Sequence, residues 1–508
     1  MTEIAAKKKR FTKKEWSWIL YDWANSVYAT NIMAAIFPIL FVQIAGESGD
    51  QAWAYGTSVA TFIVALLAPF LGALADFKGM KKKLFTGFML AGVVFTALIA
   101  CTDNWKIMLV GYVISRIGFA GSNLFYDSFL TDVTDNKRMD KVSSWGYAMG
   151  YIGGSTIPFI ISIALLLIMD YNTFSQKFSI IITSVWWIVF SIPFLKHVKQ
   201  EHYVEANTKN FFKETILNTW QTAKDIFKHK GLFIFIVAYF FYIDGVGTII
   251  NVSTAYGSSL GLGSTGMIIA LLVTQIVAMP CSIIFPKIAE KITARKALMA
   301  AILVYVFICV VGFYMGYSLE PHQKAVEDKF TASITYDASV KEEAEMRTTC
   351  LSLFTGENSA EKAQEKLKEM TEEDKAANPN IVGMLNQVVS FSENEENKQL
   401  LDNFHSAISF SSLLFWGMAV LVGTVQGGIQ AVSRSYFGKI VPKERSNEFF
   451  GFFDIFGKFA SVMGPALYAV IADLTGRSSY GVLCLILLFL IGFFMLLLGK
   501  KHMETSET

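Results

Sequence analysis

Charged side chains inside long apolar stretches are the residues of this sequence whose chemistry most needs an explanation. Three cations lie in such stretches, Arg116, Arg434 and Lys458. Four aspartates share this setting: Asp22, Asp127, Asp244 and Asp454. A charge at the centre of a bilayer costs at least about 2.5–3.5 kcal/mol, so each charge in an apolar span is a functional candidate. Carboxylates and a guanidinium can hold the two ends of a zwitterion, and a buried carboxylate can carry a proton.

The intramembrane polar residues follow helical spacing. Arg116, Asn123 and Asp127 make one stripe, and Gln426, Gln430 and Arg434 make another. We therefore predict a solute or proton site from one set of residues: Asp22, Asn25, Arg116, Asn123, Asp244, Asn251, Gln426 and Gln430. Asp127 and Arg434 stand near helix ends, which favours a gate. Asp454 and Lys458 are four residues apart and are interpreted as a structural ion pair.

The elements that must position these residues are membrane helices. Only 17% of the 508 residues are charged and 53% are hydrophobic, whereas about a quarter of an average soluble protein is charged. Apolar runs of the roughly 20 residues that span a bilayer recur along the chain. They predict twelve helices, near 16–45, 52–76, 84–102, 105–131, 142–169, 178–196, 231–257, 264–286, 297–319, 404–436, 447–472 and 479–499.

The distribution of charge predicts the domain plan. Most of the 44 Lys and Arg fall on one side when the loops alternate, so both termini are expected in the cytoplasm. The plan comprises a tail (1–15), a six-helix half (16–196), a cytoplasmic linker (197–230), a second half (231–499) and a tail (500–508). The second half contains an extracytoplasmic insert, 320–403, with 18 acidic and 9 basic residues. The insert is either a tolerated loop or a docking site for an unknown partner.

Weak internal repeats relate the two halves. DFKGMKKKL (76–84) aligns with EKITARKAL (290–298) at an offset of 214, which pairs Asp76 with Glu290 in equivalent turns. DNKRMD (135–140) aligns with PKERSN (442–447) at an offset of 307, which pairs Asp127 with Arg434. The difference between the offsets is close to the length of the insert. These repeats predict an all-α integral membrane fold of two pseudo-symmetric six-helix halves.

Two levels of family resemblance follow from specific motifs. The turn with Gly72, Asp76, Gly79 and Lys81-Lys82 is similar to the signature of the major facilitator superfamily. This resemblance makes Asp76 and its counterpart Glu290 gate candidates beside Asp127 and Arg434. Three longer segments resemble the vacuole-effluxer family: YDWANSVYAT (21–30), FFYIDGVGTII (240–250) and VQGGIQAVSRSYFGKIVPKERSNEFFGFFDIFGKFASVMGP (425–465). The resemblance implies solute transport, with amino-acid efflux known for fungal members.

We therefore expect a transporter of a small polar solute, foremost amino acids, that works by alternating access in a bacterial inner membrane. Transport could be coupled to protons. We expect a monomer surrounded by lipid, and we expect no cofactor, metal or nucleic acid. The five cysteines show no disulfide framework or metal-ligand spacing. No HExxH, GxSxG or Walker motif favours an enzyme. Carriers of a sugar, peptide or drug-like cation, and a receptor that uses the insert, remain alternatives.

Overall fold

The computed structural model describes residues 10–46, 49–169, 172–205, 211–262, 264–356 and 358–501. Parts of the predicted tails (1–9 and 502–508) and of the linker (206–210) lie outside the described residues. The described chain contains twelve helices that are long and apolar enough to cross a membrane. The predicted fold class, an all-α membrane protein, is therefore confirmed.

The first six spans form the N-terminal half. In order they are α2 (Lys13–Tyr28) with η1 (Ala29–Ala35) and α3 (Ile36–Ala45), α4 (Gly49–Ala75), α5 (Met80–Ile99), α6 (Trp105–Ser128) with α7 (Leu130–Val133), α8 (Met139–Gly150) with η3 (Tyr151–Thr156) and α9 (Ile157–Ile168), and α10 (Thr173–His197). Polar caps begin several of these helices. The Thr12 side chain, for example, accepts a hydrogen bond from the Glu15 amide and opens α2 with a capping box.

The last six spans form the C-terminal half, which follows the linker helix α11 (Phe211–Lys228). These spans are α12 (Lys230–Ser259), α13 (Ser264–Ile292), α14 (Ala294–Thr331), α19 (Glu395–Ile440), α20 (Ser446–Thr475), which the short turn η4 (Lys443–Arg445) precedes, and α21 (Ser478–Leu498). The sequence predicts the linker only as a connecting segment. It contains a helix because its apolar and polar residues alternate with helical period, and Arg445 of η4 donates a hydrogen bond to Asp225 of α11 at 3.1 Å.

The first and fifth spans contain π-helical turns where side chains join neighbouring helices. The Asn31 amide in η1 donates hydrogen bonds to the hydroxyls of Ser162 and Thr183, at 3.0 and 2.9 Å. In η3, a Cβ on Gly154 would lie 2.0 Å from the Ser26 Cβ, so the two spans touch closely. The π-helical turns therefore coincide with close contacts among the first, fifth and sixth spans.

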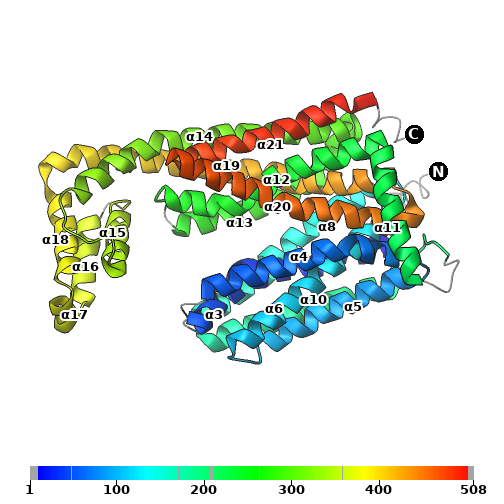
Figure 1. Cartoon of the computed structure of the whole chain (residues 1–508), viewed down its shortest axis with the longest axis horizontal. Coiled ribbons are helices and arrows are strands. Elements are labelled where there is room, and N and C mark those ends of the chain that lie inside the picture. The colour runs from blue at the N-terminus through cyan, green and yellow to red at the C-terminus, as the bar shows by residue number, and fades with distance from the viewer. Residues whose placement is uncertain are drawn as a thin grey trace.

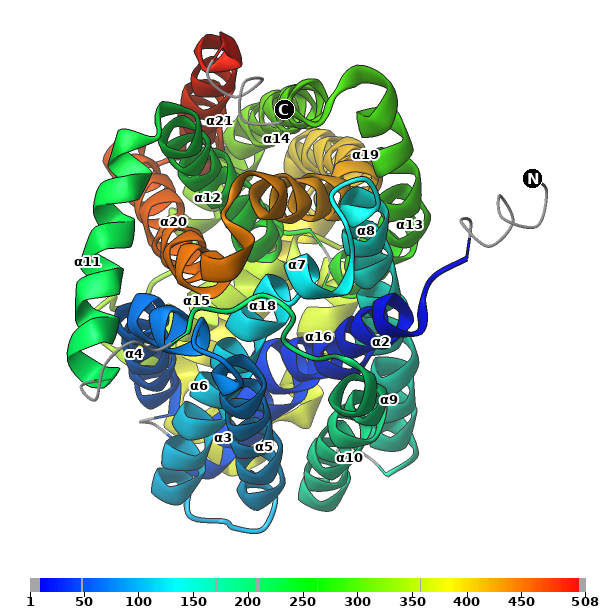
Figure 2. The same cartoon turned by 90° about the vertical axis from the view of Figure 1, so that its right-hand side faces the viewer.

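The two ends of the bundle differ. We call the end where α2 begins, α21 ends and α11 lies the linker end, and the opposite end, with α15–α18, the insert end. Figure 1 shows the two halves converging at the linker end, whereas their ribbons diverge toward the insert end. Viewed onto the linker end in Figure 2, α20, α8 and α7 lie where the halves meet, and α11 runs along one side.

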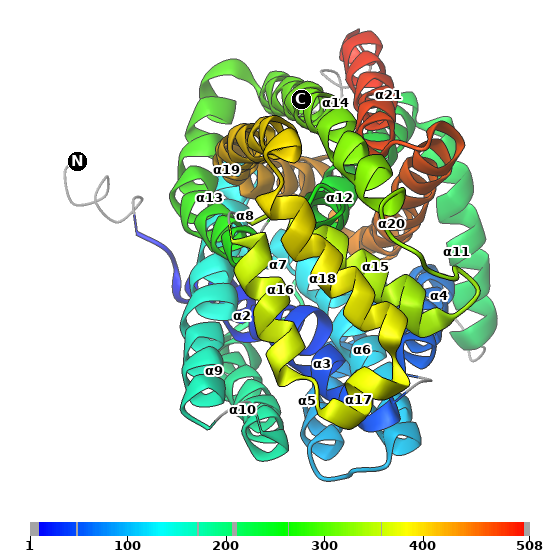
Figure 3. The same ribbon diagram turned by 90° about the vertical axis from the view of Figure 1, so that its left-hand side faces the viewer.

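The insert is a small helical unit carried on two extended membrane helices. It contains α15 (Lys341–Leu353), α16 (Ser359–Glu369), α17 (Glu372–Ala377) and α18 (Pro379–Glu393). Because α14 continues to Thr331 and α19 begins at Glu395, both ends of the predicted 320–403 segment are helical extensions. The rings of Phe330, Phe354 and Phe391 pack with centroids 5.0–5.7 Å apart and give the insert its own core. Figure 3 shows the insert in front of both halves.

Candidate functional site

Arg434 of α19 is the centre of a polar cluster that joins the two halves. Its side chain is only 4% exposed. Nη1 donates a hydrogen bond to Asp127 Oδ1 at 2.9 Å, and Nη2 lies 3.5 Å from Asp22 Oδ2. Nε donates to the Ser143 hydroxyl at 3.0 Å, and Nη2 donates to the Ser143 carbonyl at 2.8 Å. One guanidinium of the C-terminal half thus binds three helices of the N-terminal half.

Aromatic rings enclose the Arg434 guanidinium. Its carbon atom lies 4.8, 5.5 and 4.3 Å from the ring centroids of Trp18, Tyr126 and Tyr147. The Tyr126 hydroxyl also donates a hydrogen bond to Asp22 Oδ2 at 2.7 Å. The rings stabilise the cation through their faces while limiting water at the ion pairs.

Helical spacing explains why these groups meet. Trp18 and Asp22 are four residues apart on α2, as are Ser143 and Tyr147 on α8. Gly146 lies on α8 between Ser143 and Tyr147, where a Cβ would be 2.5 Å from Asp22 Oδ2 and 3.1 Å from Arg434 Nη2. A glycine is therefore needed for the close approach of α8 to the cluster.

Asp76 forms a second contact between the halves, at the start of α20. Its Oδ1 accepts hydrogen bonds from the Asn447 amide at 3.0 Å and from Asn447 Nδ2 at 2.7 Å, and its Oδ2 accepts from the Glu448 amide at 3.0 Å. The carboxyl group therefore caps the N-terminus of α20 from the other half of the protein. Burial raises the pKa of Asp76 to about 8, although these hydrogen bonds oppose the rise. Gly72 allows the approach, because a Cβ there would be 2.4 Å from the Asn447 carbonyl oxygen.

Further polar contacts reinforce the same end of the bundle. The fully buried Lys81 Nζ lies 2.5 Å from Asp132 Oδ2, which fixes the turn beside Asp76. Across the halves, Lys439 Nζ of α19 lies 2.5 Å from Asp140 Oδ2 of α8. We call the cross-half contacts of Asp76, Arg434 and Lys439 the linker-end contacts.

The remaining residues predicted on α6 and α2 lie on the insert-end side of the Arg434 cluster. Asn25 Nδ2 donates a hydrogen bond to Asn123 Oδ1. Arg116, nearer the insert end, donates from Nη1 to the Tyr112 hydroxyl at 3.1 Å and from Nη2 to the Thr61 hydroxyl at 3.4 Å. Helical spacing puts Arg116, Asn123 and Asp127 on one face of α6, and their partners lie on α4, α2 and α19.

The predicted residues of the C-terminal half are more scattered. Asp244 is fully buried, and its Oδ1 accepts a hydrogen bond from the Gly464 amide at 3.0 Å. Asn251 is exposed on α12, and Gln430 is half-buried on α19. Glu290 is exposed at the end of α13, so the structure does not bring it to the linker-end contacts.

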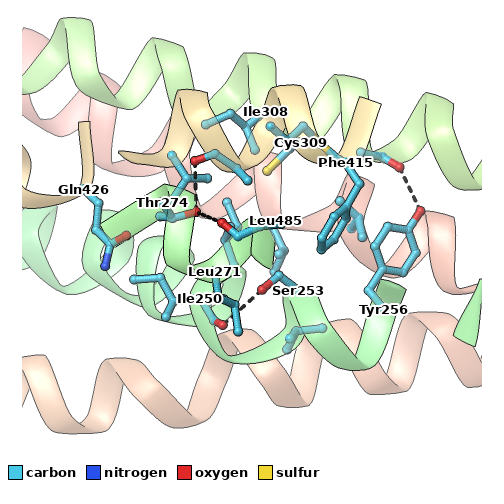
Figure 4. Close-up of a pocket in the computed structure, with 18 of the residues that line it drawn as sticks. Ile250, Ser253, Tyr256, Leu271, Thr274, Ile308, Cys309, Phe415, Gln426 and Leu485 are labelled. Atoms are coloured by element: carbon cyan, nitrogen blue, oxygen red, sulfur yellow. Dashed lines mark hydrogen bonds between the residues drawn. The ribbon is translucent and has the colours of Figure 1, made fainter. Parts of the chain in front are cut away.

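Two pockets lie near predicted residues. The first lies within the C-terminal half and is mainly apolar; Gln426 lines it together with Ser253, Tyr256 and Thr274 (Figure 4). The second lies between the halves and is lined by both charged and aromatic residues. Among the residues that line it are Asp127, Tyr239, Asp454 and Lys458. Asp454 and Lys458 form the predicted ion pair, and this pair faces the same pocket as Asp127.

Sequence reasoning missed the neutral partners of the cluster. Trp18, Tyr126, Tyr147, Ser143 and Asn447 were not singled out, because aromatic and small polar residues are common in membrane helices. Their spacing was an available signal: Trp18 stands one helical turn from Asp22, and Tyr126 directly precedes Asp127.

Comparison with known proteins assigns this chain to a family. The family profile described as "Vacuole effluxer Atg22 like" matches residues 52–327 and 411–507. The chain belongs to this family. The unmatched stretch between the two ranges contains α15–α18, so the insert is an addition to the family pattern.

Relatives support the assignment of this Atg22-like chain to the major facilitator transporters. It is 41% identical to the "Uncharacterized MFS-type transporter YxiO" of Bacillus subtilis, over 98% of this chain and 97% of that protein. Autophagy-related protein 22 of Cryptococcus neoformans is 20% identical, over 69% of this chain and 48% of that protein. The chain is therefore a multi-pass membrane transporter of the major facilitator type and not an enzyme.

Solved structures show the same fold. A bacterial homologue of the iron transporter ferroportin, in an outward-facing state, superimposes with a TM-score of 0.57 at 12% identity, over 96% of this chain and 98% of that chain. The human organic anion transporter MFSD10 gives a TM-score of 0.54 at 11% identity, over 95% of this chain and 99% of that chain. At these identities the likeness concerns the fold alone.

Proposed function

We propose that this transporter moves amino acids or similar small zwitterions across a bacterial plasma membrane by alternating access. The positive-inside rule favours a cytoplasmic linker end, because the lysines and arginines concentrate there. The insert then lies outside the cell. In this orientation the linker-end contacts form a closed cytoplasmic gate, and the protein adopts an outward-facing state.

The single observation that carries the mechanism is the sharing of Arg434 between the halves. Asp22, Asp127 and Ser143 of one half hold a guanidinium that belongs to the other half. These contacts are lost when the halves separate at this end, and water then solvates the charges. A carrier needs such breakable contacts, because neither access state may be so stable that the cycle stops.

The proposed cargo follows from the charges on the polar face. Asn25 and Asn123 lie on the N-terminal half, about one helical turn from the gate residues Asp22 and Asp127 toward the middle of the bundle. A carboxylate and amide oxygens suit an ammonium group, and Arg116 on the same face suits a carboxylate. An amino acid carries both groups. Asp22 and Asp244 are also our proposed proton sites if transport is coupled to protons.

Transport by the purified full chain in liposomes tests the proposal. Uptake of each radiolabelled common amino acid is measured with and without a pH gradient, against liposomes without protein. We expect saturable, protein-dependent flux for at least one amino acid. Flux of a sugar, a peptide or a drug-like cation with no amino-acid flux would refute the proposed cargo.

A further inference from the structure

Arg116 is a membrane-embedded cation whose protein partners are neutral. Two hydroxyl groups accept its hydrogen bonds, those of Tyr112 and Thr61. A guanidinium has five N–H groups, so these two bonds leave the greater part of its donor capacity unused. Within the part of the chain that the structure describes, no carboxylate lies within ion-pair distance of Arg116.

The other two cations of the apolar spans are compensated differently. Arg434 lies against Asp127 and Asp22. Lys458 forms an ion pair with Asp454 one turn away. Because a charge in a bilayer is normally neutralised by a nearby partner, Arg116 differs from the other two cations in having no anionic partner among the described residues.

The position of Arg116 lets an anion from the interior of the transporter reach it. Arg116 and Asp127 are eleven residues apart on α6, which puts them on one face and about 16 Å apart along the axis. That face points to the C-terminal half, since Asp127 on it binds Arg434. Arg116 itself is partly exposed and lies on the insert-end side of the linker-end contacts.

The surroundings orient the guanidinium before an anion arrives. The Tyr112 hydroxyl, which also lies 3.2 Å from the Thr57 hydroxyl, holds Nη1, and Thr61 of α4 holds Nη2. Two helices thus fix the planar group, and a fixed guanidinium binds a carboxylate through two parallel hydrogen bonds. Pre-organisation of this kind favours a carboxylate over a neutral carboxamide.

We propose that Arg116 is the anchor for the carboxylate of the transported solute, so that this carrier selects solutes with a free carboxylate. The inference rests on the proposed transport function and adds a substrate requirement to it. Arg116 then acts as a binding residue in the N-terminal half, separate from the gate arginine.

Binding to the purified full chain tests this assignment without requiring transport. Thermal stabilisation is measured with each common amino acid, with the matching amino-acid amides, with simple monocarboxylates such as 4-methylpentanoate, and with inorganic phosphate. We expect stabilisation by carboxylates and not by amides. Arg116→Gln should weaken carboxylate binding about 10- to 100-fold, the range expected for lost charge-assisted hydrogen bonds.

Two further variants keep the test interpretable. Arg116→Lys retains the charge without the fork, so it should bind carboxylates more weakly than the wild type while still rejecting amides. Lys106→Gln removes a cation from the insert-end start of the same helix, and it should leave binding unchanged. If Arg116→Gln does not fold, the Lys variant alone decides between a bidentate anchor and no anchor.

The outcomes separate the anchor from the transport function. Equal stabilisation by acids and their amides, or unchanged binding in both Arg116 variants, would overturn the anchor while leaving amino-acid transport possible. Stabilisation by phosphate as strong as by carboxylates would reassign the site to inorganic anions. Arg116-dependent binding of carboxylates in a protein that shows no flux in liposomes would support the anchor and refute transport of these solutes.

Discussion

Replacing Arg434 with glutamine should open the linker end. In the closed arrangement the variant leaves Asp22 and Asp127 without their cation, whereas separation of the halves exposes both to water. Removing one partner of a buried ion pair costs about 3–5 kcal/mol. Because the Asp127 side chain is 32% exposed, we expect the lower value. About 3 kcal/mol corresponds to a change of roughly 150-fold in the equilibrium between closed and open states.

Accessibility of a buried position at the gate measures this shift. The Ser128 side chain is fully buried and donates a hydrogen bond to Asn447 Oδ1 of the other half, so a cysteine introduced there reports closure. In a background without the native cysteines, a water-soluble maleimide should label this cysteine about 100-fold faster in the Arg434→Gln variant. Transport should fall more than tenfold, because the outward-facing state becomes rare.

Two control variants test whether the effect of Arg434→Gln comes from the gate. Lys14→Gln removes an exposed ion pair between the start of α2 and Glu201 of the linker, and it should change labelling little. Adding Asp127→Asn to Arg434→Gln should restore part of the closure, because both the cation and one stranded carboxylate are then gone. Wild-type labelling and transport in the Arg434→Gln variant would show that the cluster does not hold the gate.

Three more perturbations test other parts of the structure. Burial raises the pKa of Asp76 to about 8 in the closed state, whereas exposure would return it towards 4, so closure should strengthen as pH falls from 8 to 4. The ratio of labelling rates between wild type and Asp76→Asn should follow this trend; a pH-independent ratio would contradict it. Gly154→Val should lower the melting temperature through about 1–3 kcal/mol of overpacking against Ser26, and an unchanged melting temperature would disprove that contact. Replacing 332–394 with a short glycine-serine linker should leave solute flux within about twofold, because the insert packs around its own phenylalanines; loss of flux would give the insert a role in transport.

The sequence predicts the architecture well because membrane helices leave a strong hydropathy signal. Apolar runs located all twelve spans, and the repeat offset that pairs Asp127 with Arg434 names two residues that bind each other at 2.9 Å. The predicted end of α14 is too early and the predicted start of α19 is too late, because both helices continue as polar extensions beyond the apolar core. Hydropathy marks where the lipid ends, and helices continue beyond it.

The partners of each charge were harder to predict, because a repeat relates positions and not environments. Asp22 and Asp244 lie on the first helices of the two halves, yet Asp22 lies against an arginine of the other half and Asp244 accepts a hydrogen bond from a backbone amide within its own half. Asp76 and Glu290 differ in the same way, one capping α20 across the interface and the other exposed. In each pair the residue of the N-terminal half makes the cross-half contact. Equivalent positions of the two halves lie at the same end of the bundle, so the repeat identifies candidate positions, and packing against the other half decides which member of a pair makes the contact.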